Sequence, residues 1–160
     1  FKFIFTYDPR LLKIDPGFFK YVQPPGLSWI QNKKVYKKKK LISFIGSSKM
    51  MCKGHNYRQT MINKYKNIAM ENAVYDYYYS EKIADCFATG TIPIYWGSRT
   101  IERHFDVNGI IFLEDLRDLK GLDANLYEKK FKHVENNLEI LKKMNTPEDF
   151  LYLNYLKDAI

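Results

Sequence analysis

The chain has 160 residues, of which 46% are hydrophobic and 28% are charged, so it is long enough for one domain with a buried core and is not disordered by composition. Its formal net charge of +8 favours a polyanionic or phosphorylated partner. Because no run of about 18 apolar residues occurs, the sequence excludes a membrane-spanning helix from this chain.

The first forty residues predict one strand, one helical turn and loops. Residues 1–7, "FKFIFTY", alternate and are rich in aromatic side chains, which is typical of a buried strand. The chain opens inside this strand without a methionine, so we expect it to be part of a longer protein; no signal peptide is expected. A helical turn is expected at residues 9–12 and a loop at residues 23–29. The lysine cluster at residues 37–40 is either a solvated linker or a set of phosphate contacts.

From residue 41 onward, the hydrophobic periodicity predicts strands that alternate with helices. The expected strands are residues 41–46, 68–70, 91–96 and 109–115. The expected helices are residues 54–65, 80–90, 99–105 and 123–144. Ser80 is the expected N-cap of the second helix, and Gly90 is its expected end. Strands that are apolar on both faces and alternate with helices predict an α/β fold with a parallel sheet flanked by helices.

Ligands of parallel α/β sheets bind beyond the carboxyl ends of the strands, in the loops that lead into the next helices. Residues 46–58 and 71–82 are the two loops of this kind. Cys52 and Cys86 lack metal-ligand spacing and are expected to be reduced thiols, and the three histidines form no metal motif. We therefore expect no bound metal.

A lysine near the start of a predicted helix breaks a local electrostatic rule. The N-terminus of a helix carries unpaired N–H groups and a partial positive charge, so Lys82 in the first turn is unfavourable there. Either Glu81 neutralises this lysine, or an anion from outside the chain binds beside it. Residues that break local rules concentrate at functional sites.

The residues around this lysine resemble the signature of the family 10 α-1,3-fucosyltransferases. The chain reads "MENA" at residues 70–73 and "YYSEKI" at residues 78–83, followed by an apolar strand that ends in Trp96 and Gly97. The family signature has the same spacing, with Phe, Ser and Thr where this chain has Met70, Ala73 and Ser80. "IFTYD" and "GHNYR" also fit the family's layout.

This resemblance implies a Rossmann-like domain that forms the C-terminal half of a GT-B glycosyltransferase and binds GDP-fucose. It implies that Arg58 and Lys82 contact the diphosphate, that Asn72 and Tyr78 line the nucleotide-sugar pocket, and that Glu81 faces the ribose or the fucose. Two basic side chains can replace a divalent ion at a diphosphate, so no metal or other cofactor is expected. The catalytic base is unknown, because in the resembled family it belongs to the N-terminal domain.

We therefore expect residues 1–160 to form a single nucleotide-sugar-binding domain, with residues 120–160 as a helical extension and the N-terminal acceptor domain absent. The expected function is the transfer of fucose, with inversion, to a glycan acceptor containing N-acetylglucosamine, although this chain alone is expected to be inactive. The alternatives are a basic nucleic-acid-binding module and an inactive GDP-sugar-binding domain. The expected location is cytoplasmic or membrane-peripheral for a bacterial or viral protein and the Golgi lumen for a eukaryotic one.

Overall fold

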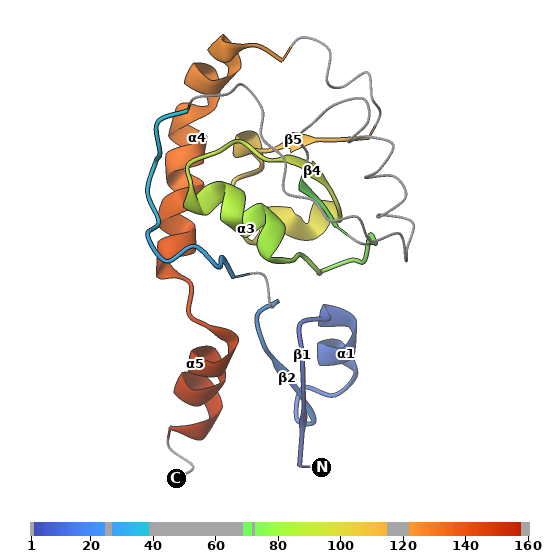
Figure 1. Cartoon of the computed structure of the whole chain (residues 1–160). Helices are drawn as coiled ribbons and strands as arrows, with labels where there is room; N and C mark the ends of the chain where they lie inside the picture. Colours follow the sequence, from blue (N-terminus) through green and yellow to red (C-terminus); the bar gives the residue numbers. More distant parts are fainter. Residues whose placement is uncertain (1, 25–26, 39–68, 72, 115–121, 158–160) are drawn as a thin grey trace, which may run out of the picture.

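The structure, a computed structural model, describes residues 2–24, 27–38, 69–71, 73–114 and 122–157 (Figure 1). The predicted strand at residues 41–46 and the predicted helix at residues 54–65 lie outside the described residues. The described residues form small parallel sheets and helices, as the sequence predicts. Their strands make two sheets, one with two strands and one with three, rather than one continuous sheet.

The N-terminal unit consists of β1 (Ile4–Thr6), α1 (Pro9–Ile14) and β2 (Phe19–Tyr21). The two strands run parallel, with Ile4 opposite Phe19. Asp8 caps α1 by accepting a hydrogen bond from the N–H of Arg10 at 2.8 Å. The prediction that the first strand is buried is wrong, because Ile4 is 42% exposed. Strand β2 was not predicted at all.

The larger sheet has the order β3-β4-β5 and is parallel throughout. Its strands are β3 (Ala69–Met70), β4 (Ile94–Trp96) and β5 (Ile111–Phe112). Helix α3 (Glu81–Ala88) connects β3 to β4, and the 3₁₀ turns η1 (Arg99–Arg103) and η2 (Val107–Gly109) connect β4 to β5. Strand β4 begins three residues later than predicted, and Pro93, just before it, has no N–H to donate to a ladder.

Helix α3 ends as its sequence predicts. The N–H of Gly90 donates to the carbonyl of Phe87 at 2.9 Å, and the N–H of Thr91 donates to the carbonyl of Cys86 at 2.8 Å. These two bonds make a Schellman motif, which requires a left-handed residue at the position of Gly90. Its φ angle is +63°.

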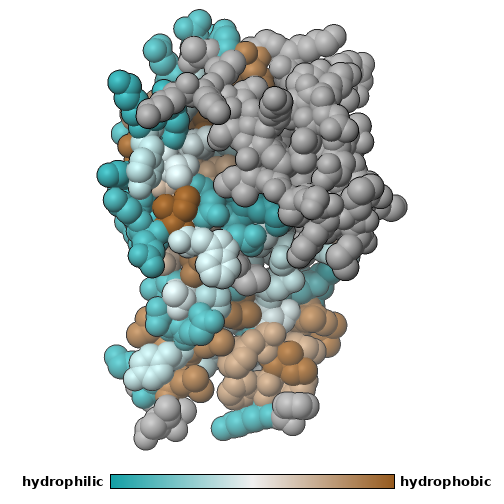
Figure 2. Space-filling model, in the orientation of Figure 1, coloured by the Kyte–Doolittle hydropathy of each residue, from teal (hydrophilic) through white to brown (hydrophobic). Residues whose placement is uncertain are grey.

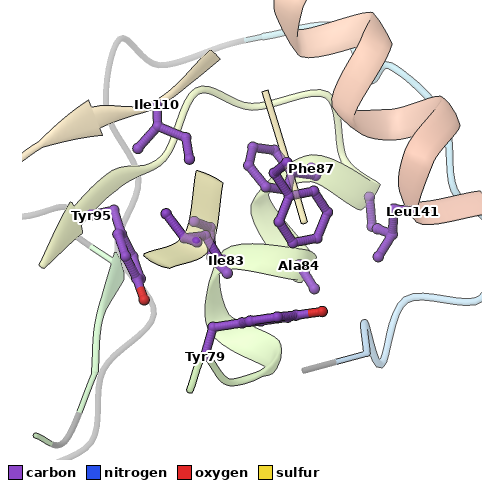
Figure 3. Close-up of a cluster of buried hydrophobic side chains, with 10 residues drawn as sticks. Tyr79, Ile83, Ala84, Phe87, Tyr95, Ile110 and Leu141 are labelled. Carbon is purple, nitrogen blue, oxygen red and sulfur yellow. The ribbon is translucent and has the colours of Figure 1, made fainter. Parts of the chain in front are cut away.

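The core forms around α3. Ile83, Ala84, Phe87 and Ala88 on this helix are each 0% exposed, as the apolar spacing of the helix predicts. They pack against residues of the neighbouring elements, namely Tyr79, Tyr95, Ile101, Phe105, Ile110 and Leu141. Figure 3 shows this cluster, with Tyr95 on one side of α3 and Leu141 on the other. Helix α3 is thereby held between the larger sheet and helix α4 (Ala124–Lys143).

Helix α4 agrees with the predicted helix to within one residue at each end. Asp123 caps its start by accepting a hydrogen bond from the N–H of Leu126 at 2.9 Å. Fully buried Asn137 fixes the helix to η2, because its side chain accepts from the N–H of Asp106 at 2.7 Å and donates to the carbonyl of the same residue at 2.9 Å. His133 adds a 2.7 Å contact to the Asp106 carboxylate.

The C-terminal segment returns to the N-terminal unit (Figure 1). Helix α5 (Pro147–Leu151) continues into the π-helical turn η4 (Tyr152–Leu156). The Tyr155 hydroxyl donates to the carbonyl of Tyr21 at 2.8 Å. Apolar side chains remain exposed here, including Ile14 and Leu153, and brown atoms gather over this lower part of the molecule in Figure 2. None of the helices in the described ranges combines the length and apolar character needed to cross a membrane.

The segment at residues 27–38 runs past the end of α3 and uses part of the lysine cluster. The N–H of Lys34 donates to the carbonyl of Ala88 at 3.0 Å. The Lys38 ammonium donates to the carbonyl of Thr89 and, at 2.9 Å, to the hydroxyl of Thr91. Burial lowers the pKa of Lys38. Lys38 of the lysine cluster thus stabilises the C-terminal end of α3, where a cation is favourable. Lys37 of the same cluster is exposed.

Candidate functional site

A buried carboxylate lies at the carboxyl end of the larger sheet. Glu71 directly follows β3, and its N–H donates to the carbonyl of Trp96 at 3.0 Å, which extends the pairing with β4 by one residue. Glu71 is only 1% exposed. Its two carboxylate oxygens accept hydrogen bonds from the Ser80 N–H at 2.9 Å and the Ser80 hydroxyl at 2.6 Å. The end of β3 is thereby tied to the start of α3.

Ser80 occupies the N-cap position, as predicted, but its side chain makes no capping bond to the helix. The hydroxyl donates to Glu71 instead. A carboxylate is a stronger acceptor than a neutral group, and bonds to it are shorter and stronger. The hydroxyl oxygen accepts from the Lys82 ammonium at 2.9 Å, rather than from a first-turn N–H as a capping serine would.

The Lys82 ammonium lies among three oxygens. It donates to the Ser80 hydroxyl at 2.9 Å and lies 3.6 Å from a Glu71 oxygen and 3.8 Å from a Glu81 oxygen. The lysine side chain is 24% exposed, against 37% for Glu81 and 2% for Glu71. Glu81 therefore contributes to neutralising this lysine, as one of the two sequence-based explanations expects. The buried Glu71 is a second compensating charge that was not predicted.

Tyr78 belongs to the same cluster. Burial raises its pKa, and the nearby carboxylates of Glu71 and Glu81 raise it further. Its ring centroid lies 6.1 Å from that of Tyr7, which follows β1. Three of the predicted donor-binding residues, Tyr78, Glu81 and Lys82, are thus brought together at the start of α3. Arg58 and Asn72, the other two, lie outside the described residues.

The loop between Ala73 and Ser80 is held in an unusual conformation. Tyr77 has a φ angle of +66°, which is rare for a bulky side chain and is found where surrounding structure enforces it. Its N–H donates to the Thr100 hydroxyl at 2.7 Å. Its ring lies under two guanidinium groups, that of Arg103 at 4.7 Å and that of Arg10 at 5.9 Å from the centroid. No sequence signal pointed to these contacts.

The Tyr95 side chain of β4 lies against Gly97. A Cβ placed on Gly97 would lie 2.2 Å from the Tyr95 hydroxyl, so only glycine fits there. Tyr95 is 1% exposed, and its hydroxyl has no hydrogen-bond partner within the described part of the chain. Burial, and secondarily Glu71, raises the pKa of this tyrosine. Tyr95 thus packs in the core, and nothing in the sequence pointed to a hydroxyl without a partner among the described residues.

The described residues include no group of three or more His, Cys, Asp or Glu side chains able to hold a metal ion. What the cluster offers is one ammonium, one phenol and the N–H groups of the first turn of α3, beside two carboxylates. Such an arrangement suits a ligand that combines anionic groups with hydroxyl groups.

Comparison with known proteins relates the chain to fucosyltransferases. No protein-family model matches the sequence. The alpha-(1,3)-fucosyltransferase of Helicobacter pylori is 30% identical over 106 residues, which make up 64% of this chain and 20% of the relative. A putative fucosyltransferase of Acanthamoeba polyphaga mimivirus is 30% identical over 96 residues, which make up 59% of this chain and 15% of the relative.

A crystal structure of an alpha1,3-fucosyltransferase with GDP-fucose is 22% identical, with a TM-score of 0.28, over 88% of this chain and 34% of that one. The chain thus spans a fifth or less of the two curated relatives. In sequence it is fucosyltransferase-like over roughly three fifths of its length.

Proposed function

We propose that this chain is the donor-binding part of a fucosyltransferase and that it binds GDP-fucose at the start of α3. The observation that carries the proposal is the convergence of Tyr78, Glu81 and Lys82 beside buried Glu71, beyond the carboxyl ends of β3 and β4. Sequence similarity to two fucosyltransferases supports the assignment independently.

The chemistry of fucosyl transfer fits such a site. When the bond from fucose to GDP breaks, negative charge develops on the departing diphosphate, and fixed cations and N–H groups stabilise it. The described cluster holds one ammonium and two carboxylates, so it does not neutralise a diphosphate alone. We assign the further positive charge to Arg58, whose guanidinium can bond two phosphate oxygens. Asn72 completes the proposed pocket, and no metal is required in this proposal.

The larger architecture we propose is a GT-B enzyme in which residues 1–160 belong to the Rossmann-like donor domain. Transfer proceeds with inversion to an acceptor that contains N-acetylglucosamine. An inverting transfer needs a carboxylate base beside the acceptor hydroxyl. The proposed donor contacts of Glu81 make it a positioning group, so we place the base in a part of the enzyme outside this chain.

Ligand-induced thermal stabilisation tests the donor assignment. GDP should raise the melting temperature more than UDP does at the same concentration, because a ligand that binds only the folded state stabilises it. Equal or reversed shifts would remove the assignment to a guanine nucleotide. Tight binding of single-stranded DNA with a steep salt dependence, and no response to GDP, would establish the nucleic-acid-binding alternative instead.

Calorimetry on variants tests the proposed phosphate contacts. Lys82→Ala and Arg58→Ala should each weaken GDP binding by roughly ten- to a hundredfold, because a hydrogen bond to a charged group is worth about 1.5–3 kcal/mol. Lys142→Ala is the matched control, since Lys142 lies on α4 and pairs with Glu139 among the described residues. Unchanged GDP affinity in Lys82→Ala would return this lysine to a purely structural role.

Activity assays test the placement of the base. Incubated with GDP-fucose and acceptors that contain N-acetylglucosamine, the chain should bind the donor and form no fucosylated product, because nothing assigned here holds an acceptor against a base. Product formation that Glu81→Gln abolishes would show that the base lies in this chain and that its assignment elsewhere is wrong.

A further inference from the structure

Glu71 is the most deeply buried charged group of the site, and the proposed function gives it no contact with the donor. At 1% exposure it is withdrawn from solvent, and both of its oxygens are occupied by Ser80. A buried carboxylate loses its hydration, which only good hydrogen bonds and a nearby cation can offset. Glu71 has both.

The Ser80 hydroxyl connects Glu71 to Lys82. It donates its proton to Glu71 at 2.6 Å and accepts a hydrogen bond from the lysine ammonium at 2.9 Å. The directions of these two bonds are fixed, because the carboxylate can only accept and the ammonium can only donate. The ammonium also lies 3.6 Å from Glu71 itself. A chain of contacts thus runs from the end of β3 to the lysine Nζ.

We propose that Glu71 is a positioning residue that holds the Lys82 ammonium, through the Ser80 hydroxyl, where the donor diphosphate binds. This inference rests on the proposed function. A lysine side chain loses rotamer freedom when its ammonium binds a phosphate. Contacts that hold the side chain before the ligand binds reduce that loss. The ammonium has three N–H bonds, so it can still donate to phosphate oxygens while it remains bonded to Ser80.

Electrostatic repulsion and the positioning of Lys82 predict opposite changes in GDP affinity when the Glu71 charge is removed. Glu71→Gln deletes a negative charge that lies 3.6 Å from the proposed phosphate-binding ammonium, so repulsion alone predicts tighter GDP binding. If Glu71 positions Lys82, the same variant weakens GDP binding, because a neutral amide is a weaker acceptor for the Ser80 hydroxyl and makes no ionic contact with the ammonium. The sign of the change decides between the two.

The experiment measures GDP affinity by calorimetry in single and double variants. Glu71→Gln and Ser80→Ala should each weaken GDP binding about tenfold, and Ser80→Thr, which keeps the hydroxyl, should bind like the wild type. In the Lys82→Ala background, Glu71→Gln should cause no further loss, because the two residues act as one unit. A merely structural role would lower affinity equally in both backgrounds, and that result would overturn the proposal. Tighter or unchanged binding in Glu71→Gln would overturn it as well.

A measurement without ligand separates this inference from the proposed function. A lysine ammonium that is held by hydrogen bonds exchanges its protons slowly and gives a sharp ¹H–¹⁵N signal, which Lys82→Ala identifies by its absence. This signal should persist in Ser80→Thr and disappear in Glu71→Gln and Ser80→Ala, with circular dichroism confirming that each variant is folded. Failure of the wild type to bind GDP, together with this pattern, would refute the donor assignment and leave the positioning intact. An unchanged Lys82 signal in folded Glu71→Gln would refute the positioning.

Discussion

Replacing Tyr95 by phenylalanine should stabilise the ligand-free protein. The hydroxyl of this tyrosine is buried and lacks a hydrogen-bond partner among the described residues, while the ring fills the space beneath Gly97. An unsatisfied buried polar group costs about 1–3 kcal/mol, and phenylalanine keeps the ring without that cost. For a chain of this size 1 kcal/mol corresponds to about 2–4 °C in melting temperature. We therefore expect Tyr95→Phe to melt at least about 2 °C higher than the wild type.

Tyr79→Phe is the matched control, because Tyr79 is equally buried but its hydroxyl faces the Met144 sulfur at 4.0 Å. That variant should gain little or lose slightly. Urea unfolding followed by circular dichroism measures both changes in the free energy of unfolding. A Tyr95→Phe protein that is less stable than the wild type, beside an unchanged Tyr79→Phe protein, would show that the Tyr95 hydroxyl is bonded and that our reading of this group is mistaken.

The buried tyrosines Tyr79 and Tyr95 should also make the free energy of unfolding depend on pH in the alkaline range. Burial raises the pKa of both tyrosines above the ordinary value of 10.0. The unfolded chain therefore loses these protons first, so the stability they contribute is complete below pH 10 and declines as the pH rises further. Tyr95→Phe removes one of the two contributions, and its free energy of unfolding should fall less steeply above pH 10 than that of the wild type.

Three further changes test other parts of the fold. Gly90→Ala should destabilise the protein by about 1–2 kcal/mol in urea unfolding, because its left-handed φ disfavours a Cβ and that atom would lie 2.9 Å from Val35; an unchanged midpoint would contradict the Schellman motif. Gly97→Ala should cost about 1–3 kcal/mol by pressing on the Tyr95 ring, and Tyr95→Leu in the same chain should recover part of the loss. Desolvation raises the pKa of the partly buried Cys86 thiol to about 12, so iodoacetamide should modify it slowly at pH 8 in the native state and rapidly in urea, as site-resolved mass spectrometry would show; rapid native modification would contradict the raised pKa.

Long elements with clear ends were predictable from the sequence, and short strands were not. Helix α4 was predicted to within one residue at each end because its periodic pattern is long and Asp123 marks its start. Strand β2 was missed because three residues between Gly17 and Pro24 carry no readable period. The predicted strand at residues 91–96 was too long, since Pro93 interrupts the pairing pattern that an apolar run suggests.

The site was predictable only in part. The local conflict at Lys82, together with the motif that resembles fucosyltransferases, pointed to the start of α3, and the structure places Tyr78, Glu81 and Lys82 there. Glu71 was present in the same motif, yet its role depends on a carboxylate that reaches from β3 to a serine nine residues later. Periodicity describes which face of an element is buried and carries no information about such a contact. The sequence signal for the contact between Glu71 and Ser80 was only an acidic residue that precedes a helix with serine at its N-cap.

The start of α3 contains several energetically unfavourable features that capping a helix does not require. A serine at the N-cap suffices to satisfy an exposed N–H group. Here that serine is bonded to a buried carboxylate, and a lysine stands in the first turn against the helix dipole. Buried ion pairs are weak contributors to stability, because desolvation offsets most of their attraction. The left-handed Tyr77 and the Tyr95 hydroxyl, which has no partner among the described residues, are two further unfavourable features of this region. Unfavourable local features that the fold does not require, when they cluster in one region, are typical of a ligand-binding site. That expectation supports the start of α3, rather than the lysine cluster, as the site on which the function of this chain depends.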